Sequence, residues 1–339
     1  MTFRPALLVT IDTEGDNQWA RPRAITTENA RFLPRFQELC ERHGLKPTYL
    51  TNYEMAVCPT FAAFGQQVLR QGMGEIGMHL HAWNSPPLDH ALTSDDLARH
   101  PPLIAYPPEV IGAKVTYMTR LLEDRFAIDV VSHRAGRWGL NGIYLAALVA
   151  NGYKVDCSVT PHMHWRYGGL GSGRDRIVDY RTAPEHPYHP SLEDVARAGS
   201  TGLLELPMTV VSLDPRPLRS LRNRLDPRSM AARALARIRP AHVWLRPRLG
   251  NLPRMQWLLD QVLGQGRGYA QLILHSSELM PGGSPYFPHA SDVETLYRDL
   301  ECLFSYARDR FIGATVGEFA AAVAGSNAAS AGMLACNSR

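Results

Sequence analysis

The stretch that decides the fold is Ala6–Asp16, which reads ALLVTIDTEGD. Its first half is apolar or β-branched, which is typical of a strand buried on both faces of a parallel sheet. Its second half carries three acids at intervals of two residues, Asp12, Glu14 and Asp16. Alternate side chains of a strand share a face, so these carboxylates are expected on one side. Because α/β folds keep their active sites at the carboxyl ends of parallel strands, the acids predict a functional site there.

The composition is that of an ordinary globular protein. The 339 residues are 45% hydrophobic and 20% charged, which allows a sizeable core. No apolar run approaches the roughly 20 residues that span a bilayer, and a first strand starting by Ala6 leaves no room for a secretory signal. The five cysteines are scattered and form no CxxC pair, which disfavours a disulfide frame or a thiolate zinc site. These features predict a cytoplasmic protein with reduced thiols.

Strand and helix patterns alternate along the chain, which favours a mostly parallel sheet. About seven strand candidates predict an α/β fold, a distorted and incomplete (β/α) barrel with long loops on the carboxyl side. Two long stretches between elements, 82–108 and 160–199, are expected to be functional loops. We expect one domain over residues 1–325 and a flexible C-terminal tail over 326–339, which is rich in Ala, Ser and Asn.

An arginine-rich insertion is expected at residues 214–250, which contain ten arginines, no lysine and two acids. Leu, Met and Ala alternate with these arginines over 218–238, a pattern that suits a basic amphipathic helix lying on anionic lipid at the inner membrane face. The arginines could instead bind a phosphate-bearing substrate, such as a lipid-linked or nucleotide-linked sugar. A solvated insertion without a ligand is the third interpretation. No recognisable nucleic-acid-binding fold surrounds the segment, so no nucleic-acid partner is expected.

Three further strand ends bring polar groups to the same face as the acids. Two histidines at i and i+2 share a face, and with one carboxylate they make the N/O ligand set of a catalytic zinc site. Either pattern alone is weak, because a strand-end His is most often a satisfied polar residue and strand-end acids often cap the next helix. Their combination on one face predicts a metal site. The residues concerned are His79 and His81 in GEIGMHLHAW, Arg134 and Arg137 in SHRAGRWG, and His275 and Glu278 in LILHSSEL.

In order and spacing these motifs resemble those of the NodB-homology polysaccharide deacetylases, carbohydrate esterase family 4 and its wider superfamily. VTIDTEGD resembles the first motif, EIGMHLHAW the metal-binding histidine motif and HRAGRWG the arginine-bearing motif. YKVDCSV stands where the fourth motif lies, and LILHSSE resembles the fifth. The resemblance covers roughly residues 5–325. It is greatest to a cytoplasmic branch associated with bacterial surface-polysaccharide gene clusters, which shares the ending HSSELMPGGSPYF.

The resemblance implies one divalent metal ion and hydrolysis of an N-acetyl, or less often O-acetyl, group on a sugar. It implies that Asp12 is the general base and that Arg134 steadies it. It further implies that Glu14 and His79 are metal ligands and that His275 is the general acid. Zinc is the expected metal, with cobalt, nickel or manganese as alternatives.

The sequence departs from the family pattern at two places. The second histidine of the motif commonly lies four residues after the first, a position held here by Trp83. His81 is therefore expected as the third ligand. Thr13 separates acids that are commonly adjacent, so Asp16 in place of Glu14 remains an alternative.

A mechanism argued from the residues agrees with this resemblance. A metal held by Glu14, His79 and His81 would lower the pKa of water and polarise an amide carbonyl. Asp12 would take the proton of the attacking water, and His275 would protonate the departing amine.

Further residues are assigned around this centre. Asp156 is predicted to hold His275 in its charged form. Trp83, Arg137, Trp138 and Glu278 are predicted to bind substrate. The indoles would stack on sugar or, equally well, pack a lid, and Glu278 would bind a hydroxyl or brace the following turn.

The predicted function is a metal-dependent hydrolase that removes an acetyl group from a sugar in a cytoplasmic glycan or lipid-linked glycan intermediate. One alternative is a small-amide amidohydrolase of the same superfamily, similar to allantoinases. Another is a non-catalytic glycan-binding scaffold. Metal content and acetate release distinguish them, since only the deacetylase gives both.

Overall fold

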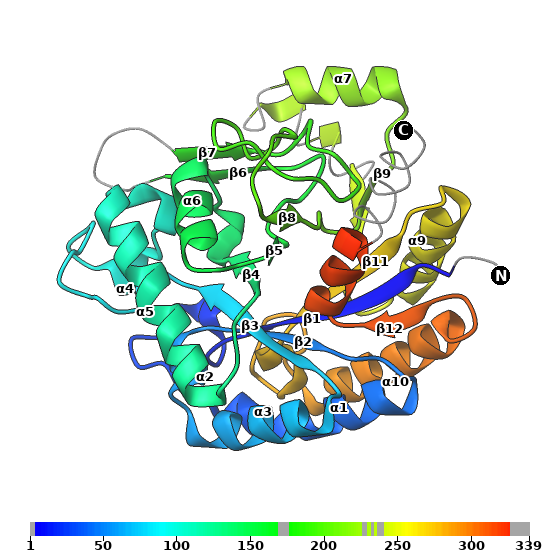
Figure 1. Cartoon of the computed structure of the whole chain (residues 1–339). Coiled ribbons are helices and arrows are strands. Elements are labelled where there is room, and N and C mark those ends of the chain that lie inside the picture. Colours follow the sequence, from blue (N-terminus) through cyan, green and yellow to red (C-terminus); the bar gives the residue numbers. More distant parts are fainter. Residues whose placement is uncertain (1–3, 169–175, 226–228, 232–233, 236–240, 326–339) are drawn as a thin grey trace, which may run out of the picture.

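The computed structural model describes residues 4–168, 176–225, 229–231, 234–235 and 241–325. Its centre is a parallel sheet that curls into an open half-barrel with helices around the outside (Figure 1). The predicted distorted, incomplete (β/α) barrel is confirmed. The strands run in the order β11-β1-β2-β3-β4-β5-β8. Their bounds are β1 (Ala6–Thr13), β2 (Thr48–Thr51), β3 (Glu75–Leu80), β4 (Ser132–Ala135), β5 (Val155–Asp156), β8 (Leu204–Glu205) and β11 (Tyr269–His275).

Strand β1 is paired along both edges. β11 lies along one edge over Ala6–Asp12. On the other edge a short strand, β12 (Ile312–Ala314), pairs with the start of β1, and β2 pairs with its end. All eight residues of β1 are buried. The apolar run of the sequence therefore forms the central strand, as expected for a strand with neighbours on both sides.

The two faces of β1 enter different cores. Leu7, Val9 and Ile11 pack with residues of the surrounding helices. Ala6 and Leu8 belong to a smaller cluster inside the barrel, with residues of β2, β5 and β8 and with Val316 and Ala320 of a helix over 316–325. Alternation places Thr10 and Asp12 on this inner side as well.

Six helices make up most of the outer layer. Their bounds are α1 (Leu33–Arg42), α3 (Pro59–Gln71), α5 (Pro108–Phe126), α6 (Gly142–Ala150), α9 (Leu252–Gly264) and α10 (Ala290–Ala307). The sequence predicts one helix over Thr27–His43, but the structure has a 3-10 helix, η2 (Glu28–Phe32), before α1. Pro34 accounts for the break, because proline has no N–H for the helical ladder and suits the first turn of a helix. The short helices are α2 (Tyr53–Ala56) and α4 (Asp96–Arg99).

Two antiparallel ribbons, one in the second long loop and one at the base of the arginine-rich insertion, are not predicted by the sequence pattern. They pair β6 (His164–Tyr167) with β7 (Arg176–Asp179), and β9 (Val210–Ser212) with β10 (His242–Trp244). The expected insertion at 214–250 leaves the barrel after β9, carries α7 (Arg216–Arg224), and returns through β10. The predicted tail at 326–339 lies outside the described residues. The strands of the two ribbons have only three or four residues each, which is too short for the alternation of apolar and polar residues to be recognised in the sequence.

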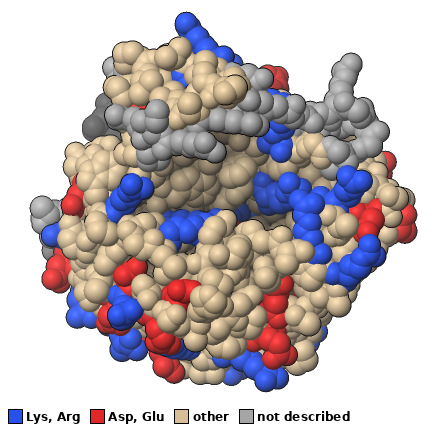
Figure 2. All heavy atoms as spheres, turned by 180° about the vertical axis from the view of Figure 1, so that it is seen from behind, with Lys and Arg blue, Asp and Glu red and all other residues tan. Residues whose placement is uncertain are grey.

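The face opposite that of Figure 1 is hollowed, and Lys and Arg side chains edge the hollow (Figure 2). Within the described part of the chain, no helix has both the length and the apolar character needed to cross a membrane.

Candidate active site

The predicted metal ligands, the base and the acid meet at the carboxyl ends of β1, β3, β4 and β11. Asp12 is the register partner of His275 across β1 and β11. His79 is the register partner of Arg134 across β3 and β4. Side chains from positions far apart in the sequence thus share one end of the barrel, where α/β folds place their chemistry.

Asp12 is held by a buried arginine. Nη1 of Arg134 donates to Oδ1 of Asp12 at 2.5 Å, and Nη2 donates to Oγ1 of Thr10 at 2.8 Å. Arg134 is fully buried. Burial works to raise the pKa of Asp12, but the charge of Arg134, helped by His79 and His275, outweighs it and leaves that pKa below its ordinary value. Asp12 is therefore ionised at neutral pH, with Oδ2 turned away from the arginine.

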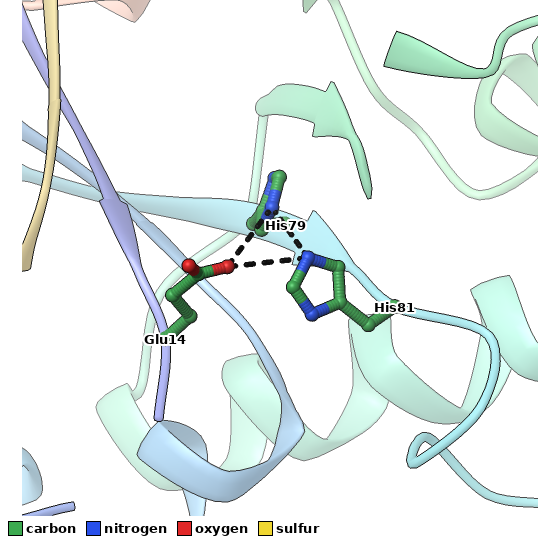
Figure 3. Close-up of side chains that lie close together, drawn as sticks. All are labelled: Glu14, His79 and His81. Atoms are coloured by element: carbon green, nitrogen blue, oxygen red, sulfur yellow. Dashed lines mark hydrogen bonds and ion pairs between the residues drawn. The ribbon is translucent and has the colours of Figure 1, made fainter. Parts of the chain in front are cut away.

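Glu14, His79 and His81 bring three ligand atoms together (Figure 3). Oε2 of Glu14 is 3.3 Å from Nε2 of His81 and 3.8 Å from Nε2 of His79. The two Nε2 atoms are 3.0 Å apart. All three residues are buried, and one O and two N donors are a set that suits a divalent ion such as zinc.

The electrostatics of this group fit a cation. Burial lowers the pKa of His79 to about 4 and lowers that of His81 well below its ordinary value, so both rings are neutral at pH 7. Nδ1 of His79 lies 3.0 Å from the carbonyl oxygen of Arg134, which places the proton of the neutral ring on Nδ1 and the lone pair on Nε2. Burial, then the charge of Asp12, raises the pKa of Glu14 well above its ordinary value. A cation bound here would favour the ionised carboxylate.

Asp16 is committed elsewhere. Its carboxylate accepts hydrogen bonds from Oγ1 of Thr26, from the backbone N–H groups of Glu28 and Asn29, and from the side-chain amide of Asn29. It therefore orders the first turn of η2. This arrangement favours Glu14 over Asp16 as the ligand.

His275 faces both acids. Its Nε2 is 3.8 Å from Oδ2 of Asp12 and 4.0 Å from Oε1 of Glu14. Its Nδ1 accepts a hydrogen bond from Nη2 of Arg246 at 3.0 Å, and the ring of Trp19 packs edge-on at 4.9 Å. The ring nitrogen that points into the site is thus Nε2.

The predicted pairing of Asp156 with His275 is wrong. Asp156 is in register with His133, and its Oδ1 is 2.5 Å from Nδ1 of that residue. His133 precedes Arg134 on β4, so its side chain lies on the opposite face from the site. The carboxylate beside His275 is instead that of Glu278, whose Oε2 lies 3.6 Å from Nδ1.

Glu278 lies beneath the site rather than in it, which corrects its prediction as a substrate ligand. It is fully buried in the 3-10 helix η5 (Ser276–Leu279). Its carboxylate pairs with Arg246 at 3.0 Å and Arg248 at 3.3 Å and accepts the backbone N–H of His275 at 2.8 Å. Burial opposes ionisation, but Arg246 and His275 hold the pKa of Glu278 below its ordinary value. Its contacts fix His275 and two arginines.

The predicted aromatic residues border the site in different ways. Trp83 is buried and stacks on His81, with ring centroids 4.2 Å apart, and on His100 at 4.1 Å. It therefore also supports a ligand ring. Trp138 is half-buried and stacks on Trp165 at 6.0 Å. Its indole also lies over the guanidinium of Arg134 at 5.5 Å.

A cavity of about 460 Å³ opens above these groups. The residues predicted for the site that line it are Asp12, Glu14, His79, His81, Trp83, Arg137, Trp138 and His275. A second cavity of about 640 Å³ adjoins it and shares Trp138, Trp165 and Arg246. Trp19, Arg21 and Arg246 line the first cavity but were not predicted, since they lie outside the motifs. The one available signal was the concentration of arginine around Arg246.

Comparison with known proteins bears on the fold. No protein-family model matches the sequence, and no curated protein matches it either. Among solved structures, a candidate glycoside hydrolase/deacetylase from Parabacteroides distasonis is 12% identical, covers 94% of this chain and 71% of its own, and has a TM-score of 0.58. The chain shares the fold of this structure.

Two other structures have lower TM-scores. A candidate polysaccharide deacetylase from Mycobacterium smegmatis is 14% identical over 96% of both chains, with a TM-score of 0.49. A candidate polysaccharide deacetylase involved in O-antigen biosynthesis from Bordetella bronchiseptica is 14% identical, covers 94% of this chain and 91% of its own, and has a TM-score of 0.38. The likeness concerns the fold, and membership of the family that the motifs resemble, like that of its cytoplasmic branch, stays a prediction.

Proposed function

We propose that this chain is a metal-dependent deacetylase that removes an acetyl group, N-acetyl in the first instance, from a sugar. The observation that carries the proposal is the position of Asp12. It is ionised and held by Arg134, it lines one cavity with Glu14, His79 and His81, and its Oδ2 is 3.8 Å from Nε2 of His275. A base, a metal-ligand set and a proton donor around one cavity are the parts that amide hydrolysis needs.

Glu14, His79 and His81 would hold the metal, zinc being the expected ion and cobalt, nickel or manganese the alternatives. When bound, the ion would lower the pKa of a water molecule and polarise the acetyl carbonyl. Neighbouring groups hold the ligand side chains of His79 and His81 in place. The carbonyl of Arg134 fixes the tautomer of His79, and Trp83 stacks on His81.

Asp12 takes the proton of the attacking water at Oδ2. Its other oxygen is occupied by Arg134, which keeps the carboxylate ionised and fixes its direction. Deprotonation of water during attack avoids the formation of free hydroxide, and a base placed in this way contributes roughly 10²- to 10⁴-fold to rate.

His275 delivers a proton from Nε2 to the departing amine. Protonation is needed because an amine anion is a poor leaving group. To carry both protons, His275 must release the hydrogen bond that Nδ1 accepts from Arg246 and donate from Nδ1 instead. The acceptor would be Oε2 of Glu278, which lies 3.6 Å from that atom. We assign to Glu278 the role that the sequence analysis gave to Asp156.

The sugar would lie against Trp138 at the mouth of the cavity, because aromatic faces suit the apolar faces of sugar rings. A single domain over 1–325, a cytoplasmic setting and a glycan or lipid-linked intermediate as substrate remain predictions. Membrane contact through 214–250 also remains a prediction, and parts of that segment lie outside the described residues.

The test is metal content together with acetate release. The purified protein would be loaded with zinc, incubated with N-acetylated and O-acetylated sugars, and followed by an acetate assay and mass spectrometry. We expect acetate that disappears with a chelator and returns with zinc. Bound metal with hydrolysis of small amides but no acetate would indicate an amidohydrolase. Neither metal nor acetate would indicate a binding protein.

A further inference from the structure

Arginines reach the cavity from four separate segments of the chain. They are Arg21, Arg137, Arg166 and Arg246. The two carboxylates that line the same cavity are already engaged, Asp12 by Arg134 and Glu14 by the histidines. Figure 2 shows the same excess of positive charge around the hollow. A cavity of one sign of charge concentrates ligands of the opposite sign.

Arg137 is presented to the cavity by an unusual backbone. Arg137 and Trp138 have φ values of 57° and 64°, in the left-handed region that side chains with a Cβ avoid. Two hydroxyls hold this turn: that of Tyr167 donates to the carbonyl of Arg137 and that of Tyr180 donates to the carbonyl of Trp138. Strain maintained by neighbouring contacts is a mark of functional positions. The turn places a guanidinium beside the indole proposed to carry the sugar.

Arg137 and Arg21 both lack a negative partner in the structure. The guanidinium of Arg137 donates to the backbone carbonyl of His100 and lies over the ring of Tyr167 at 5.0 Å. Arg21 donates to the carbonyl of Ala98 at 3.0 Å. Among the described residues, no carboxylate lies within salt-bridge distance of either arginine.

The charge of Arg21 affects Arg137, and both charges affect His100. Burial and the charge of Arg21 lower the pKa of Arg137, against the opposing influence of Tyr167. His100 is buried and lines the cavity, and its Nε2 has no hydrogen-bond partner among the described residues. Burial, followed by the charges of Arg21 and Arg137, lowers the pKa of His100 to about 4. Converging cations around an unpartnered polar atom are costly without an anion.

We propose that Arg21 and Arg137 bind an anionic group, a phosphate or a carboxylate, on the acetylated sugar. Guanidinium groups suit both, because their fixed forks pair with anionic oxygens. This inference rests on the proposed function and specifies its substrate class, a charged rather than a neutral sugar.

Arg246, which also lines this cavity, and Arg248, which lines the adjoining one, do not carry the inference. Arg246 and Arg248 share the carboxylate of Glu278, and Arg246 also bonds His275. Their charge is therefore partly compensated and has a positioning role. Arg21 and Arg137 have no such role in the structure.

Binding of charged and neutral sugars to the zinc-loaded protein tests the proposal. The Asp12→Asn protein would be titrated by calorimetry with N-acetylglucosamine 1-phosphate, N-acetylglucosaminuronate and N-acetylglucosamine, and mass spectrometry would verify that each sugar stays intact. We expect at least one charged sugar to bind about 10- to 100-fold more tightly than the neutral one, as one or two charge-assisted hydrogen bonds predict. Comparing the affinity of the sugar phosphate with that of the sugar uronate shows which anionic group the arginines bind.

Variants locate the effect. Arg137→Gln and Arg21→Gln should each remove most of the preference by weakening binding of the charged sugar more than that of the neutral sugar, and Arg137→Lys should restore part of it. Arg23→Gln is the matched control, because Arg23 is exposed, pairs with Asp95 and lies outside the cavity. Arg21 is exposed, so its variant is informative even where Arg137→Gln unfolds the protein.

Two results overturn the proposal. One is equal affinity for charged and neutral sugars, including no measurable binding of any. The other is a charge preference that survives both glutamine variants. Acetate release by the unsubstituted protein separates the two proposals. Release without charge preference removes only the anion site, and charge preference without release removes only the deacetylase.

Discussion

Asp12 and His275 are register partners on β1 and β11, and Nε2 of His275 lies 3.8 Å from Oδ2 of Asp12. The pair joins the first and last long strands of the barrel, and its two residues are 263 positions apart in the sequence. A proton acceptor and a proton donor thus share one edge of the sheet. Their spacing depends on backbone pairing rather than on flexible loops.

Asp12→Asn should abolish turnover and keep the metal. The amide retains an oxygen for Arg134 but cannot accept a proton from water, so we expect the rate of acetate release to fall roughly 10²- to 10⁴-fold. Metal content should be unchanged. Asp16→Asn is the matched control, and it should keep activity while losing about 1 kcal/mol of stability from the first turn of η2. Unchanged turnover in Asp12→Asn would remove Asp12 as the base.

His79→Ala should lose the metal. Removing one of three ligands should weaken zinc binding by more than the roughly 10- to 100-fold that the loss of an outer partner costs. Metal content after dialysis, and the rise in unfolding temperature on zinc addition, measure the effect. His90→Ala is the control, because His90 is exposed and lies outside the cavity. Zinc retained at full stoichiometry in His79→Ala would contradict the assigned ligand set.

The metal-free protein should lose stability as the pH falls from about 6.5 to 4. Burial lowers the pKa of His79 from 6.5 to about 4, so in this window the unfolded chain binds a proton that the folded chain does not. The difference corresponds to roughly 3 kcal/mol for this group. The raised pKa of Glu14 has the opposite effect, because the stability that this group contributes to the folded protein is lost as the pH rises.

Comparison with His79→Gln isolates the histidine. Urea unfolding with chelator at pH 7, 6, 5 and 4 should give a shallower decline for the variant, by about 3 kcal/mol over the range. Parallel curves for the two proteins would show that His79 titrates normally in the folded state.

Glu278→Gln should lower kcat more than it changes KM, because the side chain acts through His275 and does not line the cavity. The loss of a buried charge that serves two guanidiniums should also cost about 3–5 kcal/mol in the free energy of unfolding. Glu294→Gln is the matched control, since its pairing with Arg35 is exposed and its loss should change the free energy of unfolding far less. A raised KM with normal kcat would return Glu278 to the role of a substrate ligand.

Deleting residues 218–239 should reduce binding to anionic vesicles more than it reduces activity on a short soluble sugar. Each arginine near an anionic surface contributes about 1 kcal/mol. Co-sedimentation with vesicles rich in phosphatidylglycerol measures the effect, and neutral vesicles are the control. Equal binding with and without the segment would end the membrane interpretation.

The sequence predicts the barrel and the strand-borne part of the site because both follow from short-range patterns. The apolar run of β1 and the alternation of Asp12 with Glu14 and of His79 with His81 determine which side chains share a face. The prediction for Asp156 fails because it ignores the same alternation. Arg134 points inward, so its neighbour His133 points outward, and Asp156 pairs with His133.

The loop-borne part of the site could not be read in this way. Trp19, Arg21 and Arg246 reach the cavity through loops whose course depends on distant contacts, such as the bond from Arg21 to Ala98. Glu278 offered a local clue, since an acid three residues after His275 fits a capping box. Its pairing with Arg246 and Arg248 depends on the return of the chain through β10 and had no local signal.

β11, β12 and β2 pair with both edges of β1. Adding or removing one residue within β1 would therefore turn its inward-facing side chains outward and carry Asp12 away from its partners. Insertions and deletions in related or engineered chains must then be confined to the loops around the cavity. Grafting a different rim onto this frame, with Arg21 and Arg137 replaced, is a route to altering which sugars are accepted while the hydrolytic machinery stays in place.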